Sequence, residues 1–407
     1  YGVHVYNKGA DVAHTLRGYM GDSLFWAGLQ YHMNISQFSD VSSADFRDNL
    51  IVATGLTYLN DFFNDWVFNP GFPHFSIDSV VSVPNGPDYD VTVYVEQKLR
   101  GAPNFYTNVP LEFSFFENDM SRTTQRVLVS GQYFNFTTTL PFDPVMTAID
   151  VDGKISDAIT DEERTITAAG TQNYTAARCT VTVMTVPDTT YMRIEHNWAA
   201  PDAIQNNPSN YRISSLRYWT IDGIIPAGFY AKARFYYDGR TGSTAGPGQW
   251  LDNDLTIVNG DSIILLYRRD ASEEWQEWPY YSKTVIGPVA TSKYGYAEID
   301  SLAKGEYAFA CGVSTVLIGV DEEAAPNGEV IAYPNPACDQ LTVEWPVGDE
   351  PVEIRIYDTE GRLVHAERAG GSLIKLVTDR WSGGIYNVEV IREGQLLGRN
   401  KVLIYRH

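Results

Sequence analysis

The spacing of apolar residues changes near Phe75, and this change constrains the fold more than any other feature of the chain. Before it, large apolar residues recur at the interval of one helix face: Leu59, Phe62, Phe63 and Trp66. After it, apolar and polar residues alternate over 90–97 and 111–115, which is the period of a half-buried strand. We therefore expect helices over residues 7–69 and strands in most of the chain that follows.

Polar residues and glycine mark the expected ends of these helices. The pairs Asp22-Ser23 and Ser42-Ser43 precede apolar runs, where N-cap residues are favoured. Gly55 fits a C-cap, because glycine adopts the left-handed conformation at low cost. The segment Pro70-Gly71-Phe72-Pro73 then stops helix formation.

The composition indicates a globular protein and argues against one class of partner. Apolar residues make up 44% of the 407, which is ample for packed cores. The formal net charge of -21 argues against nucleic acid as a partner, because phosphate binding needs clustered Lys and Arg. No run approaches the roughly eighteen apolar residues of a membrane-spanning helix. Cys179 and Cys311 either pair within one β-domain or are buried free thiols.

Two motifs near the start of the chain carry a resemblance to a known family. They are Tyr6-Asn7-Lys8-Gly9-Ala10 and Asp61-Phe62-Phe63-Asn64-Asp65-Trp66-Val67. With them, residues 1–73 closely resemble the second half of the catalytic domain of gluzincin (aminopeptidase N-like) zinc metallopeptidases. The resemblance implies that Tyr6 is catalytic and stabilises the tetrahedral oxyanion opposite the zinc, where a phenol donates a hydrogen bond without adding charge. The alternative is a packing residue whose hydroxyl reaches water or backbone.

The resemblance also implies that the zinc ligands lie upstream of Tyr6. A metallopeptidase site needs two histidines one helical turn apart and a glutamate base. None of the 7 histidines here precedes a glutamate, and no two are spaced i, i+4. We therefore expect zinc and a peptide substrate only in a longer parent. This chain, as a fragment or processed product, should bind no cofactor and should not turn over alone.

Two β-rich domains are expected after the helices. Residues 74–160 suit a small β-sandwich and resemble the β-domain that follows the catalytic domain in the same family. A second domain is expected over 161–318, with alternating segments at 179–183, 231–237 and 262–268. Asp152-Gly153 fits a hairpin turn, whereas an EF-hand loop does not fit there. Four tryptophans form either core or a sugar-stacking surface: Trp219, Trp250, Trp275 and Trp278.

The end of the chain carries a third set of motifs after an acidic linker at 319–332. They are Tyr333-Pro334-Asn335-Pro336, Gly384-Ile385-Tyr386-Asn387-Val388 and Lys401-Val402-Leu403-Ile404. Residues 333–407 thereby resemble the C-terminal sorting domain of type IX secretion cargo from Bacteroidetes-type Gram-negative bacteria. The resemblance implies a seven-stranded Ig-like sandwich that the type IX secretion machinery recognises and that is usually cleaved on export. It places the protein in the medium or on the outer-membrane surface, by way of the periplasm.

The sequence thus predicts a multidomain α+β protein with an N-terminal helical segment, two β-sandwich-like domains and a C-terminal Ig-like β-sandwich. The first functional hypothesis is the C-terminal portion of a secreted zinc aminopeptidase that hydrolyses N-terminal peptide bonds, with Tyr6 as the catalytic residue in this chain. The alternative is a non-catalytic cell-surface scaffold, adhesin or carbohydrate-binding protein exported by the same route. A His-Glu-x-x-His motif upstream would separate the two hypotheses.

Overall fold

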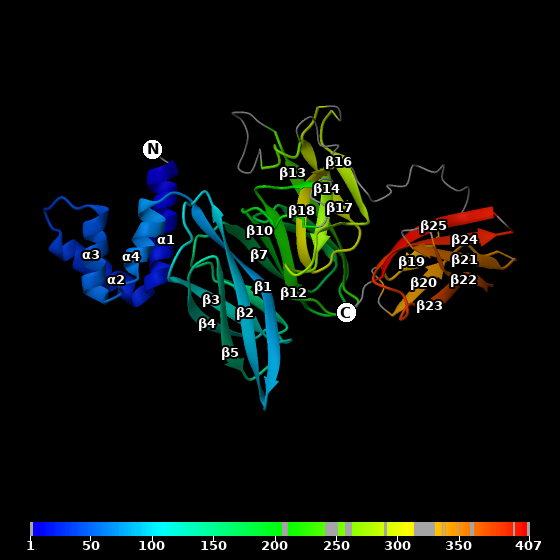
Figure 1. Cartoon of the computed structure of the whole chain (residues 1–407), viewed down its shortest axis with the longest axis horizontal. Coiled ribbons are helices and arrows are strands. Elements are labelled where there is room, and N and C mark those ends of the chain that lie inside the picture. Colours follow the sequence, from blue (N-terminus) through cyan, green and yellow to red (C-terminus); the bar gives the residue numbers. More distant parts are fainter. Residues whose placement is uncertain are drawn as a thin grey trace. The chain divides into compact units, whose positions relative to one another are not determined.

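The chain forms two compact units, which are described separately (Figure 1). The computed structural model describes residues 3–205, 211–240, 251–256, 263–288, 291–312, 330–335, 337, 339–348, 350–358, 362–393 and 395–404. The first unit comprises Tyr1–Gln276 with Ser282–Val313, and the second comprises Glu277–Tyr281 with Ser314–His407. Strands take up 50% of the chain, and 14% is helical.

Short helices open the first unit. They are the π-helix η1 (Val3–Lys8), α1 (Gly9–Met20), α2 (Asp22–Ile35), α3 (Ser43–Thr54), α4 (Leu59–Phe62) and the π-helix η2 (Phe63–Phe68). Ser42 caps α3, because its Oγ accepts the Asp45 N–H at 3.2 Å while the Asp45 carboxylate accepts the Ser42 N–H at 2.8 Å. Gly55 ends α3 with φ 76°. Both predicted ends of α3 are confirmed.

The predicted N-cap at Asp22-Ser23 is wrong. Asp22 is the first residue of α2, and no side chain caps that helix. The Asp22 carboxylate instead accepts the Arg17 Nε–H at 2.7 Å, across the junction with α1. The ion pair thus takes the side chain that a cap would have used.

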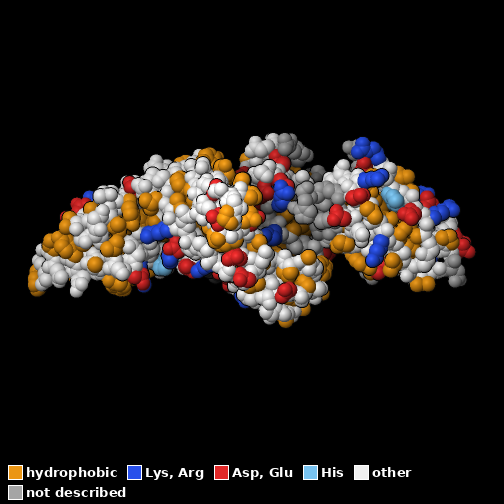
Figure 2. Space-filling view, turned by 90° about the horizontal axis from the view of Figure 1, so that it is seen from below, with side chains coloured by type: hydrophobic (Ala, Val, Ile, Leu, Met, Phe, Trp, Pro, Cys, Tyr) orange, Lys and Arg blue, Asp and Glu red, His pale blue; other side chains and the backbone are white. Residues whose placement is uncertain are grey.

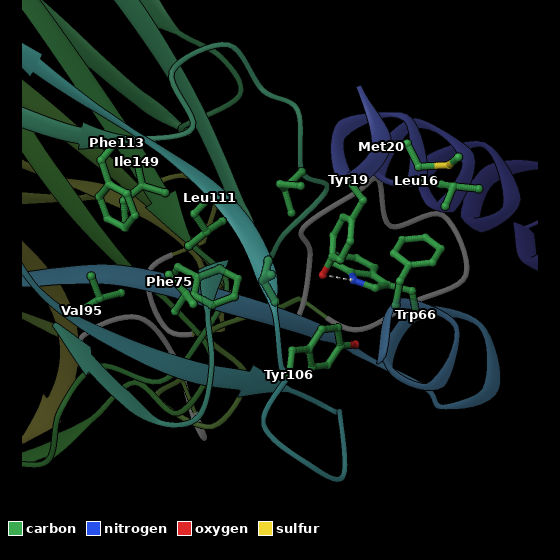
Figure 3. Close-up of a cluster of buried hydrophobic side chains, with 14 of the residues drawn as sticks. Leu16, Tyr19, Met20, Trp66, Phe75, Val95, Tyr106, Leu111, Phe113 and Ile149 are labelled. Carbon is green, nitrogen blue, oxygen red and sulfur yellow. Dashed lines mark hydrogen bonds between the residues drawn. The ribbon is translucent and has the colours of Figure 1, made fainter. Parts of the chain in front are cut away.

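The helices and the first β-sheets share one hydrophobic core (Figure 3). Trp66, from η2, is fully buried and donates its indole N–H to the Tyr19 hydroxyl of α1 at 3.1 Å. The Tyr106 ring, from the β-region, meets the Trp66 ring edge to face, with centroids 5.2 Å apart. Phe75 and Leu111 continue the same cluster into the sheets.

The expected α+β class, beginning with a helical half of a catalytic domain, is therefore wrong. The four α-helices have 4 to 14 residues each, too few to enclose a core of their own. They bury their apolar residues together with those of the first sheets instead. The molecule is mostly β, with strands in 50% of the chain.

Apolar side chains are also exposed on the helical region, at the left of Figure 2. They come from α2, the segment after it, and α3: Trp26, Met33, Ile35, Phe38 and Val52. Trp26 is 58% exposed and Met33 69% exposed. Such a gathering is larger than the scattered apolar residues normal for a protein surface.

The first β-sandwich consists of two three-stranded sheets, ordered β1-β2-β5 and β4-β3-β6. Their strands are β1 (Phe72–Asn85), β2 (Asp88–Arg100), β3 (Val109–Phe116), β4 (Arg122–Val129), β5 (Tyr133–Leu140) and β6 (Met146–Ile149). Phe113 of β3 and Phe136 of β5 pack between the sheets with ring centroids 4.7 Å apart. The alternation at 90–97 and 111–115 lies within β2 and β3, so those strand predictions are confirmed.

A second, larger sandwich completes the first unit. One sheet has the order β15-β14-β18-β12-β10-β7, with β11 beside β18, and the other is β16-β17-β13-β9-β8. The strands are β7 (Ile159–Ile166), β8 (Gly170–Tyr174), β9 (Cys179–Thr185), β10 (Thr190–Asn197), β11 (Tyr211–Ile213), β12 (Tyr218–Ile224), β13 (Tyr230–Asp238), β14 (Ile263–Arg268), β15 (Gln276–Glu277), β16 (Tyr281–Val285), β17 (Tyr294–Ile299) and β18 (Gly305–Gly312).

Aromatic rings fill the space between these two sheets. Phe235 of β13 stacks on Tyr307 of β18 with centroids 4.8 Å apart, and it meets Trp219 of β12 at 5.2 Å. Each of the three side chains is fully buried. Because rings from both sheets interdigitate, the core is a closed aromatic layer.

The second unit is a β-sandwich of the sheets β19-β20-β23 and β22-β21-β24-β25. Its strands are β19 (Ile331–Tyr333), β20 (Gln340–Glu344), β21 (Val352–Asp358), β22 (Leu363–Ala369), β23 (Leu373–Val377), β24 (Gly384–Arg392) and β25 (Gln395–Ile404). Leu341, Ile354 and Val388 are fully buried in its core. The β-sandwich predicted here is confirmed, whereas residues 319–329 of the predicted linker lie outside the described residues.

Candidate functional site

Tyr6 lies at the surface of the first unit. It belongs to η1, immediately ahead of α1, and is 68% exposed. In the same turn, the Lys8 ammonium lies 5.4 Å from the centroid of the Phe72 ring. Among the described residues, no three His, Cys, Asp or Glu side chains come together as ligands for a metal ion. The residues present therefore do not fit a zinc site, and the catalytic role of Tyr6 stays a prediction.

The sugar-stacking surface is not formed by the tryptophans that suggested it. Trp219, Trp275 and Trp278 are 0%, 4% and 3% exposed, respectively. Trp250 lies outside the described residues. The three described rings belong to the core, because a face that stacks on sugar has to be open to solvent.

Two smaller expectations concern cysteines and the 150–157 segment. Cys179 and Cys311 do not form a disulfide with each other, and burial raises the pKa of Cys179. Asp150 closes a turn, because its carboxylate accepts the N–H groups of Lys154 and Ile155 at 2.9 and 2.7 Å. Gly153 has φ 59° in this turn. The strands on either side, β6 and β7, pair with other strands, so the segment is a turn but not a hairpin.

A cavity of about 570 Å³ lies in the first unit, between the first sandwich and the second. The first sandwich contributes β1, the β5–β6 loop and β6 to its wall. The second contributes β10, β12, the segment after β14 and the start of β18. Clefts between packed layers are a common place for ligand sites, and the volume suits a small organic ligand.

A β-bulge places Asp78 in the wall of this cavity. Ile77 pairs with Val95 and Ser79 pairs with Tyr94, so Asp78 is the extra residue without a partner in β2. A bulge of this kind redirects the side chain of the inserted residue. In the part of the chain that the structure describes, the Asp78 carboxylate has no hydrogen-bond or ion-pair partner.

A chain of ion pairs between buried and partly buried side chains lies close to Asp78. Its links are Glu306 to Arg268 at 2.5 Å, Arg268 to Asp202 at 2.5 Å, Asp202 to Lys98 at 2.8 Å and Lys98 to Glu96 at 3.4 Å. Carboxylates outnumber cations in this chain of ion pairs. Burial, and then the charges of Glu96, Asp202 and Glu306, raise the pKa of Asp78 to about 7, against the opposing effect of Lys98.

The cationic side chains in the cavity wall are already paired. Arg193 contacts Glu195 at 2.8 Å, Glu163 at 2.5 Å and Asp161 at 3.0 Å. Lys304 contacts Asp222 at 2.5 Å, while Arg269 contacts Asp270 at 3.0 Å. No cation in the wall is left to neutralise Asp78, so the cavity carries excess negative charge.

Asp78 is not among the functional residues expected from the sequence. One signal was present, because the apolar positions run Phe75, Ile77 and then Val80, a step of three where a strand has steps of two. An extra residue in one strand produces such a step. The wall residues outside β1 come from the β5–β6 loop, from β6, β10, β12 and β18, and from the segment after β14, and no local sequence pattern relates them to Asp78.

Comparison with known proteins identifies the end of the chain. Residues 331–405 match the family model described as a secretion system C-terminal sorting domain. The sorting domain is present, and the chain is exported by type IX secretion to the cell surface or the medium. Its sorting domain therefore contacts the type IX secretion machinery. No helix in the described part of the chain is long and apolar enough to cross a membrane.

Similarity elsewhere is partial. The chain is 29% identical over 68 residues to "Probable aminopeptidase 2" of Sulfurisphaera tokodaii, a match that covers 17% of this chain and 9% of that protein. Dimeric latent PorU from Porphyromonas gingivalis is 13% identical, with 83% of this chain and 34% of PorU covered at a TM-score of 0.18. PorZ from the same bacterium is 11% identical, with 81% of this chain and 52% of PorZ covered at a TM-score of 0.18.

Proposed function

We propose that this chain acts as a non-catalytic scaffold at the cell surface, delivered there by its sorting domain. The observation that carries the proposal is the match of residues 331–405 to a secretion system sorting domain, in the unit that folds as its own β-sandwich. The first unit is then the cargo that the second unit exports.

The construction of the first unit supports the role of a scaffold. His74 of β1 and Asn197 of β10 are buried and form a hydrogen bond of 2.8 Å between the two sandwiches. Arg100 of β2 donates to the carbonyl oxygens of Trp198 and Leu216 at 3.2 and 3.1 Å. Several buried polar contacts of this kind fix one geometry, because breaking any of them leaves an unpaired group. The unit thus presents its surfaces rigidly.

Deletion of residues 333–407 tests the export step. The truncated protein should remain in the periplasm, since the first unit keeps its own core and loses only the sorting signal. Fractionation with immunodetection reports the location. As the matched control, residues 330–407 fused to an unrelated periplasmic protein should carry it to the surface or the medium. Normal export of the truncated chain, or retention of the fusion, would contradict the proposal.

A second candidate is a portion of a longer secreted aminopeptidase. The 68-residue similarity to an aminopeptidase favours it, although the match covers only 9% of that relative. The exposed apolar side chains on α2 and α3, such as Trp26 and Val52, are the kind of surface that another part of a longer protein covers. Zinc and its ligands would then come from outside these residues, with Tyr6 donating to the oxyanion of a peptide substrate.

A further inference from the structure

We propose that the cavity beside the β1 bulge binds an organic cation, namely an ammonium or guanidinium group on an aliphatic stem. This inference goes beyond the role in export and scaffolding, and it rests only on residues of the first unit. Its basis is a cavity of about 570 Å³, an excess of carboxylates in its wall and a bulge that places the carboxylate of Asp78 there without a hydrogen-bond or ion-pair partner among the described residues.

The balance of charge in the wall favours a cation. Six carboxylates line the cavity, against three cationic side chains. The carboxylates are Asp78, Asp143, Glu195, Asp222, Asp270 and Glu306. Since the three cations are each held by a carboxylate, a bound anion would meet no unpaired cation, whereas a bound cation would meet Asp78.

The apolar part of the wall favours an aliphatic stem behind the charge. Phe75 and Ile77 of β1 line the cavity together with Met146 of β6 and Ile221 of β12. A stem in contact with these side chains would leave water while its charged end reaches Asp78. A bare metal ion suits the site less well, because no three potential metal ligands come together among the described residues.

The β-bulge explains why the Asp78 carboxylate is free of protein partners among the described residues and can contact a ligand. In a regular strand the residue after Ile77 would pair with Tyr94, and the pairing of Ser79 with Tyr94 shows that Asp78 has been displaced from the ladder. Bulges are often found beside binding sites because they redirect a side chain. An unpaired carboxylate half-buried beside other carboxylates is unfavourable in the empty protein, and a bound cation removes that cost.

Binding should depend on pH through Asp78. The charged groups near it are Glu96 and Lys98 on β2, Asp202 after β10, Arg268 on β14 and Glu306 on β18, with the Tyr133 hydroxyl on β5. Burial, and then the charges of Glu96, Asp202 and Glu306, raise the pKa of Asp78 to about 7, and Lys98 opposes them. A cation binds the ionised form, so affinity should rise by up to about tenfold per unit as pH increases towards 7, and should level off above about 8.

The test uses the full chain and two probes that differ only in charge. The probes are Nα-acetyl-L-arginine methylamide and its neutral isostere, Nα-acetyl-L-citrulline methylamide. Titration calorimetry from pH 5.5 to 8.5 should show binding of the arginine probe that strengthens with pH. The citrulline probe should bind about tenfold to a hundredfold more weakly at pH 8, the usual effect of losing a charge-assisted hydrogen bond.

Two variants complete the test. Asp78→Asn keeps the shape of the side chain and removes its charge, so it should weaken the arginine probe by about tenfold to a hundredfold and abolish the pH dependence. Asp88→Asn, in β2 of the same hairpin but outside the cavity wall, should bind as the unmodified chain does.

Equal affinity for the two probes would overturn the proposal, as would pH-independent binding, absent binding of the arginine probe or unchanged binding by Asp78→Asn. The comparison of probes needs only the unmodified chain, so it decides the matter even if a variant fails to fold.

Discussion

Asp78 should cost the protein stability at neutral and alkaline pH, and replacing it with asparagine should recover that stability. Its folded-state pKa of about 7 lies above the ordinary value of 3.8. Between about pH 4 and pH 7, the folded protein therefore keeps a proton on Asp78 that the unfolded chain has already released. The contribution of Asp78 to the free energy of unfolding is therefore fully present below the unfolded-state pKa, and it is lost as the pH rises through 7. The amide of Asp78→Asn resembles the protonated acid at every pH.

The size of the effect follows from the pKa shift and the exposure of the side chain. A shift of about three units corresponds to about 4 kcal/mol at full effect. Asp78 is only half-buried, and solvent screening reduces such contributions, so we expect Asp78→Asn to stabilise the first unit by about 1–2 kcal/mol at pH 8. At pH 4 the two proteins should differ little.

Scanning calorimetry at pH 4 and pH 8 measures this difference. The unfolding temperature of the first unit should rise by about 2–5 °C in Asp78→Asn at pH 8 and stay within error at pH 4. Asp88→Asn should leave it unchanged at both. A gain of equal size at the two pH values would show that something other than ionisation of Asp78 is responsible, and a loss at pH 8 would refute the electrostatic reasoning.

Two further substitutions test the packing of α1 and the second functional candidate. Gly18→Ala should destabilise the first unit by about 1–3 kcal/mol, because the added Cβ would lie 2.3 Å from the Lys154 carbonyl oxygen. Gly9→Ala, whose Cβ would meet nothing within 4 Å, should be neutral or stabilising by about 0.5 kcal/mol. Denaturant unfolding compares the pair, and equal effects would show that α1 does not lie against the Lys154 segment. In a longer aminopeptidase that contains this chain, Tyr6→Phe should lower turnover by about a hundredfold to a thousandfold with zinc content unchanged; near-normal steady-state turnover would remove Tyr6 from the mechanism.

Local structure in this chain was largely predictable from periodicity. The alternating segments at 179–183 and 231–237 lie within β9 and β13, and helices occupy most of 7–69. Ser42 and Gly55 bound α3 as expected, because a serine N-cap and a left-handed glycine act through backbone groups close in sequence. These elements depend on neighbours within a few positions, which a single sequence displays.

The fold class was not predictable in the same way. Helical periodicity shows that a segment has an apolar face, but it does not show what covers that face. Here the Tyr19 and Trp66 side chains meet Tyr106 from the β-region, so the helices complete a β-sandwich core. The burial of Trp219 and Trp275 could likewise not be predicted from the sequence, because tryptophan occurs both in protein cores and on sugar-binding faces.

The residues of the cavity wall could not be recognised as a site from the sequence, because only the fold brings them together. Asp78 lies in β1 between Ile77 and Ser79, and Glu306 is the second residue of β18. Their relation arises from the bulge that displaces one and the strand pairing that holds the other beside Arg268. A carboxylate that lowers stability in the empty protein persists most readily where it meets a ligand, because binding repays the cost of its burial. The stability experiment and the binding experiment therefore probe one property of Asp78, and the substitution that strengthens the fold should be the one that weakens binding of the cation.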